Sequence, residues 1–343
     1  MLLSFFYREN MQHVKDHISE RHLEEILHRY GIEKDQVKFL NSLANLIYEF
    51  ERDGESCILR IGHTSRRDGL QTMGEIDWLQ HLAKGGAGVA YPLPSASGQF
   101  VEEVDDGQGG QYVAVSFIKA RGKAVDDAVW NERFFEAYGR HMGNIHALSQ
   151  TYQLPNEAWK RPAWDLPGMY PIETFLPEPS QAHLVKNFFE IKDHLMSLPK
   201  NADAYGLTHQ DPHKGNLFVD EDYTITMYDF DDCCYGFFIH DLAMVLFYAA
   251  LNEKDRLTFA QEFLPPFLKG YAQENKLDPV WLQELPHFMK LREIYLYAIA
   301  VYIAKTQPDV EWTGNYINML KQSVDENLAY IDLDFSQYAD VLS

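Results

Sequence analysis

Apolar and polar residues alternate along two neighbouring segments near the N-terminus. The apolar residues stand at every second position, at Leu46, Tyr48, Phe50, Cys57, Leu59 and Ile61. A period of two is typical of half-buried strands, and an Asp-Gly pair such as Asp53-Gly54 between two such runs favours a tight turn. The pattern predicts an antiparallel hairpin. A second hairpin is expected from residues 99–104 and 111–118, joined by a turn at residues 105–107.

On both sides of these hairpins, the apolar residues are spaced as in an amphipathic helix. An approximate helical face precedes the first hairpin and ends at Gly31; it comprises Met11, Val14, Ile18, Ile26, Leu27 and Tyr30. Residues 69–84 place Ile76, Leu79, Leu82 and Ala83 on one face. Further helices are predicted over residues 126–152 and 181–198, and over most of the chain from residue 241, with a Pro- and Trp-rich loop at 154–179.

A strand-rich first third and a helix-rich remainder predict an α+β fold with two lobes. The 343 residues are long for one core and comfortable for two. We expect an N-lobe built on an antiparallel sheet with helices over residues 1–117, and a larger, mainly helical C-lobe over residues 118–343. The hinge between them is expected near residues 116–122.

The net charge of the chain indicates which classes of partner it can bind. Thirty basic and fifty-one acidic residues give a formal net charge of −21. Such a surface repels phosphate backbones, so nucleic acid is not an expected partner, whereas cationic or zwitterionic ligands are favoured. Solubility alone also explains this charge. Nothing in the sequence sets the oligomeric state.

The cysteines and the apolar stretches indicate a cytoplasmic protein that does not engage a membrane. Cys57, Cys233 and Cys234 form no C-x-x-C spacing, so neither a disulfide framework nor a zinc site is indicated. The longest apolar stretches, residues 242–251 and 295–304, fall well short of the roughly 20 residues of a spanning helix. Both are interpreted as buried core helices.

Residues 208–232 carry the chemistry. His209, Asp211, His213 and Asn216 precede a predicted strand at 217–219, and Asp229 follows the next one at 225–228. A hairpin of these short strands, turning at residues 220–222, would bring the two polar groups together. Magnesium prefers carboxylate and amide oxygens, and a further carboxylate can accept a hydroxyl proton. These are the components of phosphoryl transfer.

The spacing His209-x-Asp211-x-x-x-x-Asn216 matches the kinase catalytic loop. With His213 two positions after the aspartate, the loop resembles the aminoglycoside phosphotransferase and choline kinase family more than protein kinases. Tyr228-Asp229-Phe230-Asp231-Asp232 resembles that family's metal-binding segment, and Asp241-Leu242-Ala243 its later D-x-A. The resemblance covers nearly the whole chain and implies a protein-kinase-like fold.

The resemblance implies a role for each matching residue. Asp211 is the base or orienter of the acceptor hydroxyl, Asn216 and Asp229 are ligands of magnesium, and His209 supports the loop. His213 contacts the transferring phosphoryl group. Asp241 holds the backbone of the catalytic loop, or is a plain helix N-cap.

The N-lobe departs from the protein-kinase pattern because no G-x-G-x-x-G is present. Small residues and Asn at positions 41–45, Asn45 among them, would let backbone amides approach ATP phosphates. Arg60 stands where a phosphate-binding lysine is expected, with Glu75 on the next helix as its ion-pair partner. The adenine of ATP is expected against the backbone of Phe117 and Ile118.

The acceptor is expected to be a hydroxyl of a small molecule, such as an amino alcohol, an aminoglycoside-like sugar or homoserine, as the resemblance implies. Asp231, Asp232 and Glu293 are candidates for an acidic acceptor pocket, which Trp164 would line. Phosphorylation of protein Ser or Thr is the alternative within the same superfamily. Two other classes stay open: a metal-dependent hydrolase using His209 and His213, and a nucleotide-binding pseudokinase.

Overall fold

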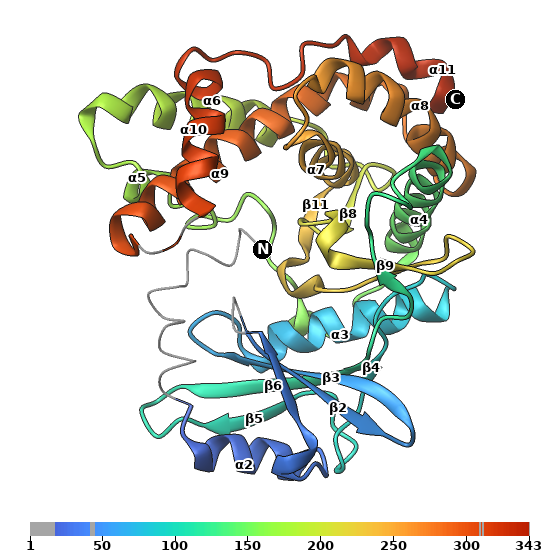
Figure 1. Cartoon of the computed structure of the whole chain (residues 1–343), viewed down its shortest axis with the longest axis vertical. Helices are drawn as coiled ribbons and strands as arrows, with labels where there is room; N and C mark the ends of the chain where they lie inside the picture. The colour runs from blue at the N-terminus through green and yellow to red at the C-terminus, as the bar shows by residue number, and fades with distance from the viewer. Residues whose placement is uncertain (1–17, 42–44, 309, 311, 343) are drawn as a thin grey trace.

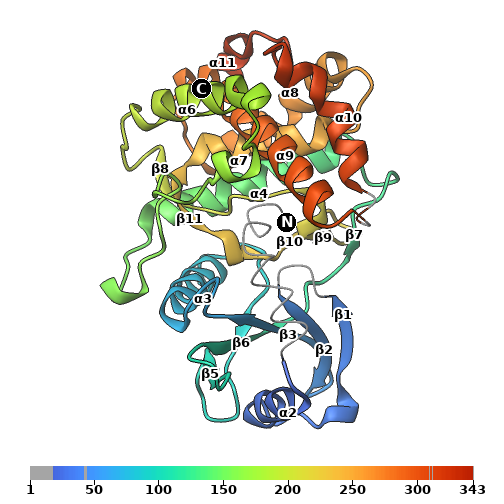
Figure 2. The same ribbon diagram turned by 90° about the vertical axis from the view of Figure 1, so that its left-hand side faces the viewer.

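The computed structural model describes residues 18–41, 45–308, 310 and 312–342. Helix α2 (Glu20–Arg29) and a six-stranded antiparallel sheet occupy one end of the molecule (Figures 1 and 2). The sheet follows the order β1-β2-β3-β6-β4, and β5 pairs with β6; its strands are β1 (Lys38–Asn41), β2 (Leu46–Arg52), β3 (Glu55–His63), β4 (Pro92–Leu93), β5 (Glu102–Asp105) and β6 (Gln111–Ile118).

The predicted first hairpin is present. Strands β2 and β3 pair with Leu46 opposite Ile61, and the turn between them places Asp53 and Gly54 at φ 55° and 81°. Two consecutive positive φ values are the geometry for which an Asp-Gly pair is suited. The second hairpin, β5–β6, begins three residues later than the predicted start at residue 99.

The period of two sorts β2 and β3 into two faces. Tyr48, Phe50 and Leu59 pack with Ile26 and Leu27 of α2 in a small core. The intervening positions, among them Ile47, Ile58 and Arg60, line a cavity on the opposite face of the sheet. Helix α3 (Gly69–Lys84) lies on that opposite face (Figure 1). Of the predicted N-terminal helical face, Met11 and Val14 lie outside the described residues.

The other end of the molecule is mainly helical (Figures 1 and 2). Its helices are α4 (Glu132–Thr151), α5 (Ile172–Phe175), α6 (Ala182–Met196), α7 (Phe238–Ala250), α8 (Arg256–Glu274), α9 (Leu285–Thr306), α10 (Trp312–Asp325) and α11 (Ala339–Leu342). The apolar stretches 242–251 and 295–304 fall in α7 and α9, whose residues are largely buried. No helix in the described ranges is long and apolar enough to cross a membrane.

Helix α4 begins six residues later than residue 126, where the sequence predicted its start. The Asn131 side chain accepts a hydrogen bond from the Phe134 amide at 3.2 Å and caps the helix. Asp126 instead accepts from the amides of Ala128 and Val129 in a turn of its own. A residue that bonds its neighbours' amides in this way competes with helix formation.

Two short antiparallel pairs bring residues 209–216 next to residues 229–233. The predicted hairpin is β9 (Leu217–Val219) with β10 (Ile225–Met227), and β7 (Lys123–Ala124) joins β9 from the other side. The second pair, β8 (Tyr205–Thr208) with β11 (Cys234–Phe237), places Thr208 opposite Cys234 and was not predicted. The two pairs fix both ends of the polar segment.

Candidate active site

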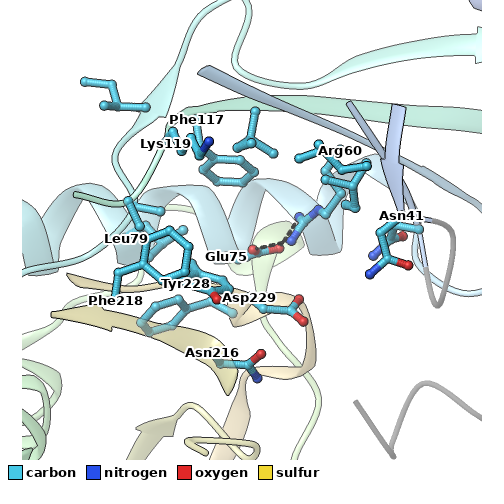
Figure 3. A pocket seen from close by; sticks show the side chains of 18 of the residues that line it. Asn41, Arg60, Glu75, Leu79, Phe117, Lys119, Asn216, Phe218, Tyr228 and Asp229 are labelled. Atoms are coloured by element: carbon cyan, nitrogen blue, oxygen red, sulfur yellow. Dashed lines mark hydrogen bonds and ion pairs between the residues drawn. The ribbon is translucent and has the colours of Figure 1, made fainter. Parts of the chain in front are cut away.

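A cavity of about 460 Å³ lies between the sheet and the β9–β10 hairpin (Figure 3). Strands β2, β3 and β6 and helix α3 contribute one wall, and residues 215–232 contribute the other. Much of the lining is apolar: Ile47, Ile58, Leu79, Ala90, Phe117 and Phe218. Charged and amide side chains, including Arg60, Asn216 and Asp229, also line it. A cavity that combines apolar walls with a few charged and amide side chains suits a ligand that is flat and apolar at one end and charged at the other.

Arg60 and Glu75 form a buried, two-pronged ion pair at the edge of this cavity. Nη1 and Nη2 of Arg60 donate to Oε1 and Oε2 of Glu75 at 2.8 and 2.6 Å. Burial favours the neutral forms of both groups, but each partner's charge outweighs it, so the pKa of Glu75 is lowered and that of Arg60 is raised. Glu75 therefore fixes the guanidinium in its charged form beside the cavity.

The loop before β9 is held by Asp241 of α7. The two carboxylate oxygens of Asp241 accept from the backbone amides of His209 and Gln210, both at 2.8 Å. Asp241 is not the N-cap of α7, which is Phe237. Buried His146 lies 3.2 Å from Asp241. Gln210 takes φ 74°, a left-handed conformation that is uncommon for residues other than glycine.

Both ring nitrogens of His209 are engaged by backbone groups. Nδ1 accepts from the Asp211 amide at 3.3 Å, and Nε2 donates to the Tyr228 carbonyl at 3.1 Å. The ring is fully buried and contacts Phe230 with centroids 4.4 Å apart. His209 thus supports the loop, and in this arrangement it has no nitrogen lone pair to offer a metal.

Asp211 is buried and ion-paired. Its Oδ1 accepts from Nη2 of Arg292 in α9 at 2.7 Å, and Nε of Arg292 donates to the Tyr248 hydroxyl at 2.9 Å. Nε2 of His213 lies 3.4 Å from Oδ2 of Asp211. Burial lowers the pKa of His213 to about 3, so this ring is neutral at pH 7.

Asn216 and Asp229 lie on the same side of the cavity, across from Arg60 (Figure 3). The Tyr228 amide donates to the Asn216 carbonyl at 2.9 Å, which extends the β9–β10 pairing and brings Asp229 beside Asn216. Nδ2 of Asn216 donates to the Asp211 carbonyl at 3.0 Å, so its Oδ1 is the side-chain atom left to face a ligand. Asp229 has φ 64° and ψ 54°, a conformation that recurs at functional sites.

Asp231 and Asp232 do not form an open acidic pocket, contrary to the expectation from sequence. Arg66 bonds both carboxylates, and Nη2 of Arg67 donates to Asp232 at 2.6 Å. Burial would raise the pKa of Asp232, but the two arginines hold it well below its usual range. Because these aspartates are neutralised by basic residues of the sheet end, they tie that end to the helical end.

Trp164 and Glu293, the other two candidates for the acceptor site, are both buried inside the protein. Trp164 is fully buried among Phe237, His240 and Phe288. Glu293 is also fully buried, and its Oε2 accepts from Lys290 at 2.7 Å. Neither side chain is exposed to a ligand, because aromatic packing and an internal ion pair occupy them.

Asn45, Phe117 and Ile118 all line the cavity. Nδ2 of Asn45 donates to Asp231 at 3.1 Å, and Ser42, Leu43 and Ala44 lie outside the described residues. The Ile118 amide already donates to the Tyr91 carbonyl at 2.8 Å. A ring bound here would therefore meet Phe117 and Ile118 through their side chains and carbonyls.

Sequence reasoning predicted Arg60 but missed four other arginines around the site: Arg66, Arg67, Arg161 and Arg292. Arg66 and Arg67 are adjacent and follow a predicted strand, which was the one available signal. Arg161 is also buried, and it donates to the backbone carbonyls of Cys233, Asp231 and Gln71. It therefore joins the segment that follows Asp229 to helix α3. Arg292 lies within a predicted apolar helix, and no local pattern links it to Asp211.

Comparison with known proteins identifies the family. The model of the phosphotransferase enzyme family matches residues 36–285. The chain belongs to this family. Over 284 residues it is 42% identical to amicoumacin kinase of Bacillus subtilis (strain 168), across 82% of this chain and 84% of that relative.

Solved structures give the same fold. A complex of amicoumacin kinase hAmiN with AMP-PNP, Ca²⁺ and Ami has a TM-score of 0.89 at 32% identity, and the match covers 95% of this chain and 99% of that one. A microcompartment-associated aminopropanol kinase has a TM-score of 0.72 at 21% identity, covering 91% and 99%. The predicted family, the α+β protein-kinase-like fold and the assignment as an ATP-dependent phosphotransferase acting on a small-molecule hydroxyl are confirmed.

Proposed function

We propose that this phosphotransferase binds ATP in the 460 Å³ cavity and transfers its γ-phosphoryl group to a hydroxyl of an amicoumacin-like antibiotic. The observation that carries the proposal is that Arg60 lines one side of the cavity and Asn216 and Asp229 line the other. Asp211 lies next to this group, because its backbone carbonyl accepts a hydrogen bond from Asn216. Phosphoryl transfer needs such positioning and charge neutralisation more than covalent chemistry.

The nucleotide is assigned to this cavity by the chemistry of its walls. The apolar walls suit the adenine, and Phe117 and Ile118 would contact it. Arg60, fixed by Glu75, suits the phosphates because a guanidinium binds phosphate oxygens through paired donors. Asn45 lies on the same wall of the cavity.

Magnesium fits Asn216 and Asp229. A carboxylate and an amide oxygen line the cavity, and the amide nitrogen of Asn216 is already used by the Asp211 carbonyl. This is the oxygen donor set that magnesium takes, with substrate phosphates completing it. When bound there, the ion would neutralise charge on the phosphates.

Asp211 would orient the acceptor hydroxyl and accept its proton as the oxygen attacks phosphorus. Arg292 holds the carboxylate in place from α9 at 2.7 Å. His209 and Asp241 hold the loop that carries it. His213, neutral and 3.4 Å from Asp211, would contact the transferring group as a neutral partner.

The acceptor class is supported by the 42% identity with amicoumacin kinase across most of both chains. The test incubates the chain with ATP, Mg²⁺ and amicoumacin and follows ADP release and the mass of the product. We expect a product that carries one added phosphoryl group, and Asp211→Asn should form it about 10²- to 10⁴-fold more slowly. Acceptor-independent ADP release, or phosphorylation of a Ser/Thr peptide instead, would refute the acceptor assignment.

The hydrolase alternative loses its support because His209 offers no free nitrogen to a metal. Retention of Asp211, Asn216 and Asp229 together argues against a pseudokinase.

We further propose a cytoplasmic location, where ATP is available and the three buried free cysteines would stay reduced. A division into lobes at residues 117 and 118 stays a proposal; limited proteolysis near residues 119–122 would test it.

A further inference from the structure

Two histidines and one glutamate meet on the helical end of the molecule, outside the cavity described above. His194 lies in the last turn of α6, Glu284 ends the short 3₁₀ helix Pro279–Glu284 before α9, and His287 lies in the first turn of α9. One ligand atom from each lies within 4.8 Å of the other two. Among the described residues, no other group of three such side chains meets this closely.

The arrangement differs from a surface ion pair, because one carboxylate oxygen faces two histidine rings. Oε2 of Glu284 lies 2.7 Å from Nε2 of His194 and 3.0 Å from Nδ1 of His287, so both rings converge on a single oxygen. The ring centroids are only 4.4 Å apart. The two rings and the carboxylate therefore form one cluster rather than two separate ion pairs.

Nδ1 of His287 is the decisive atom. It is buried, and it makes no hydrogen bond with any described group even though Glu284 is 3.0 Å away. A buried nitrogen without a hydrogen bond costs free energy, so its presence calls for an explanation. In the neutral ring with the proton on Nε2, Nδ1 presents a lone pair, which a cation between it and Glu284 would accept.

We propose that His194, Glu284 and His287 form a binding site for a divalent transition metal of the zinc type. Two imidazole nitrogens and one carboxylate oxygen are a ligand set that Zn²⁺ takes, and the hard ions Mg²⁺ and Ca²⁺ prefer oxygen alone. With metal–ligand distances of about 2.0–2.2 Å, ligand atoms of a tetrahedron lie about 3.3–3.6 Å apart, so Oε2 of Glu284 would have to move about half an ångström away from the two ring nitrogens.

The two histidines are partly exposed, so an ion can reach the site from solvent. The side chains of His194 and His287 are 42% and 44% exposed, whereas Glu284 is 15% exposed. Three protein ligands leave a fourth position of the tetrahedron open to solvent. Because His194 belongs to α6, His287 to α9 and Glu284 to the residue just before α9, the metal would cross-link these two packed helices. Arg292, which bonds Asp211, lies five residues after His287 on the same helix.

The test uses the full chain without an affinity tag, stripped with a chelator and kept in excess Mg²⁺ so that the oxygen sites are saturated. Zn²⁺ is then titrated by calorimetry. We expect one Zn²⁺ per chain. His194→Ala, His287→Ala and Glu284→Gln should each lower the affinity by more than the roughly 10- to 100-fold that loss of an outer-shell partner causes. AMP-PNP binding should be retained, which shows that the variants are folded.

His183→Ala is the matched control. His183 lies on the same helix and faces Asp325 at 3.6 Å, with no second histidine in the pair. Zn²⁺ should raise the Tm of the wild type and of His183→Ala, but not of His194→Ala. The proposal is overturned if the wild type takes up no Zn²⁺, if His194→Ala and His287→Ala keep wild-type affinity, or if His183→Ala loses as much as they do.

Discussion

Arg292 donates a hydrogen bond at 2.7 Å to Asp211, which lies 81 residues earlier in the chain. The two side chains are 5% and 1% exposed, so little solvent screens the pair. Tyr248 accepts from the same guanidinium and limits its rotation. The orientation of the proposed base therefore depends on α9 as well as on its own loop.

The first prediction concerns this positioning. Arg292→Met should lower kcat by about 10- to 100-fold, since a misplaced reacting group costs about that much. Because the change leaves the buried Asp211 without this partner, thermal denaturation must first show that the variant is folded. Arg292→Lys, which keeps the charge, should recover part of the loss. The KM for ATP should stay near the wild-type value, because Arg292 does not line the nucleotide cavity. Steady-state kinetics with Arg140→Met, an exposed arginine of α4, as control will test this. Equal losses in kcat from both methionine variants would contradict the role.

The second prediction separates stability from nucleotide binding at Arg60. Removing one member of a buried ion pair costs about 3–5 kcal/mol, so Arg60→Met should lower the free energy of unfolding by that order. Arg60→Met combined with Glu75→Gln removes both charges and should regain most of the stability. The double variant should still bind AMP-PNP weakly. Urea denaturation and calorimetry give the two readouts; restored nucleotide affinity in the double variant would remove Arg60 from the site.

The same pair gives opposite pH dependences. In the wild type the pKa of Glu75 is lowered by Arg60, so its contribution to stability is present above the unfolded pKa of 4.5 and is lost as the pH falls. In Arg60→Met, burial without a partner raises that pKa. Stability of this variant should then decrease as the pH rises through the raised value. Parallel pH profiles for the two proteins would contradict this account.

The third prediction concerns acid unfolding. Burial lowers the pKa of His141 and of His240 to about 4, from the ordinary value of 6.5. Between these values the unfolded chain binds protons that the folded chain does not, so stability falls as the pH falls. Each histidine contributes up to about 1.4 kcal/mol per pH unit. His240→Phe, which keeps a ring against Phe288, should flatten the slope by one proton. An unchanged slope in His240→Phe would show that His240 titrates normally.

Local sequence patterns predicted the strands and loop residues of the site better than they predicted its ion pairs. The period of two assigned Arg60 to a strand, and the spacing of Asp211, Asn216 and Asp229 placed them around one hairpin, because both signals depend on neighbours in sequence. Strand β1 was missed because all four of its residues are exposed and carry no alternation. Strands β8 and β11 were missed because glycine and short length hide their period.

The charge partners escaped prediction for a different reason. Arg66 meets Asp231 and Asp232 across 165 and 166 residues, and Arg292 meets Asp211 across 81. A buried charge needs a partner, but the sequence does not say which one. Asp231 and Asp232 were expected in an acidic acceptor pocket, and the sequence did not indicate that arginines from the other end of the molecule pair with them.

The fourth prediction concerns the metal. Asp229→Asn keeps the shape, and Asn tolerates the left-handed conformation at φ 64° that this position requires. The variant loses one ligand charge, so the Mg²⁺ concentration that gives half-maximal activity should rise. Asp222→Asn, in the exposed turn between β9 and β10, serves as the control. The same Mg²⁺ dependence in Asp229→Asn and the wild type would exclude Asp229 as a ligand.

The last prediction concerns Asp211, on which the proposed chemistry depends most. Asp211→Ala is a poor test, because it leaves the buried Arg292 without its partner and destabilises the fold. Asp211→Asn keeps an oxygen that accepts from Arg292 but removes the basic carboxylate. Loss of a general base typically costs about 10²- to 10⁴-fold, so kcat should fall by that order while the affinity for AMP-PNP changes little. Thermal denaturation of the variant checks its fold. Near-normal kcat would refute the role as base, and a joint loss of fold and nucleotide binding would make Asp211 a structural residue.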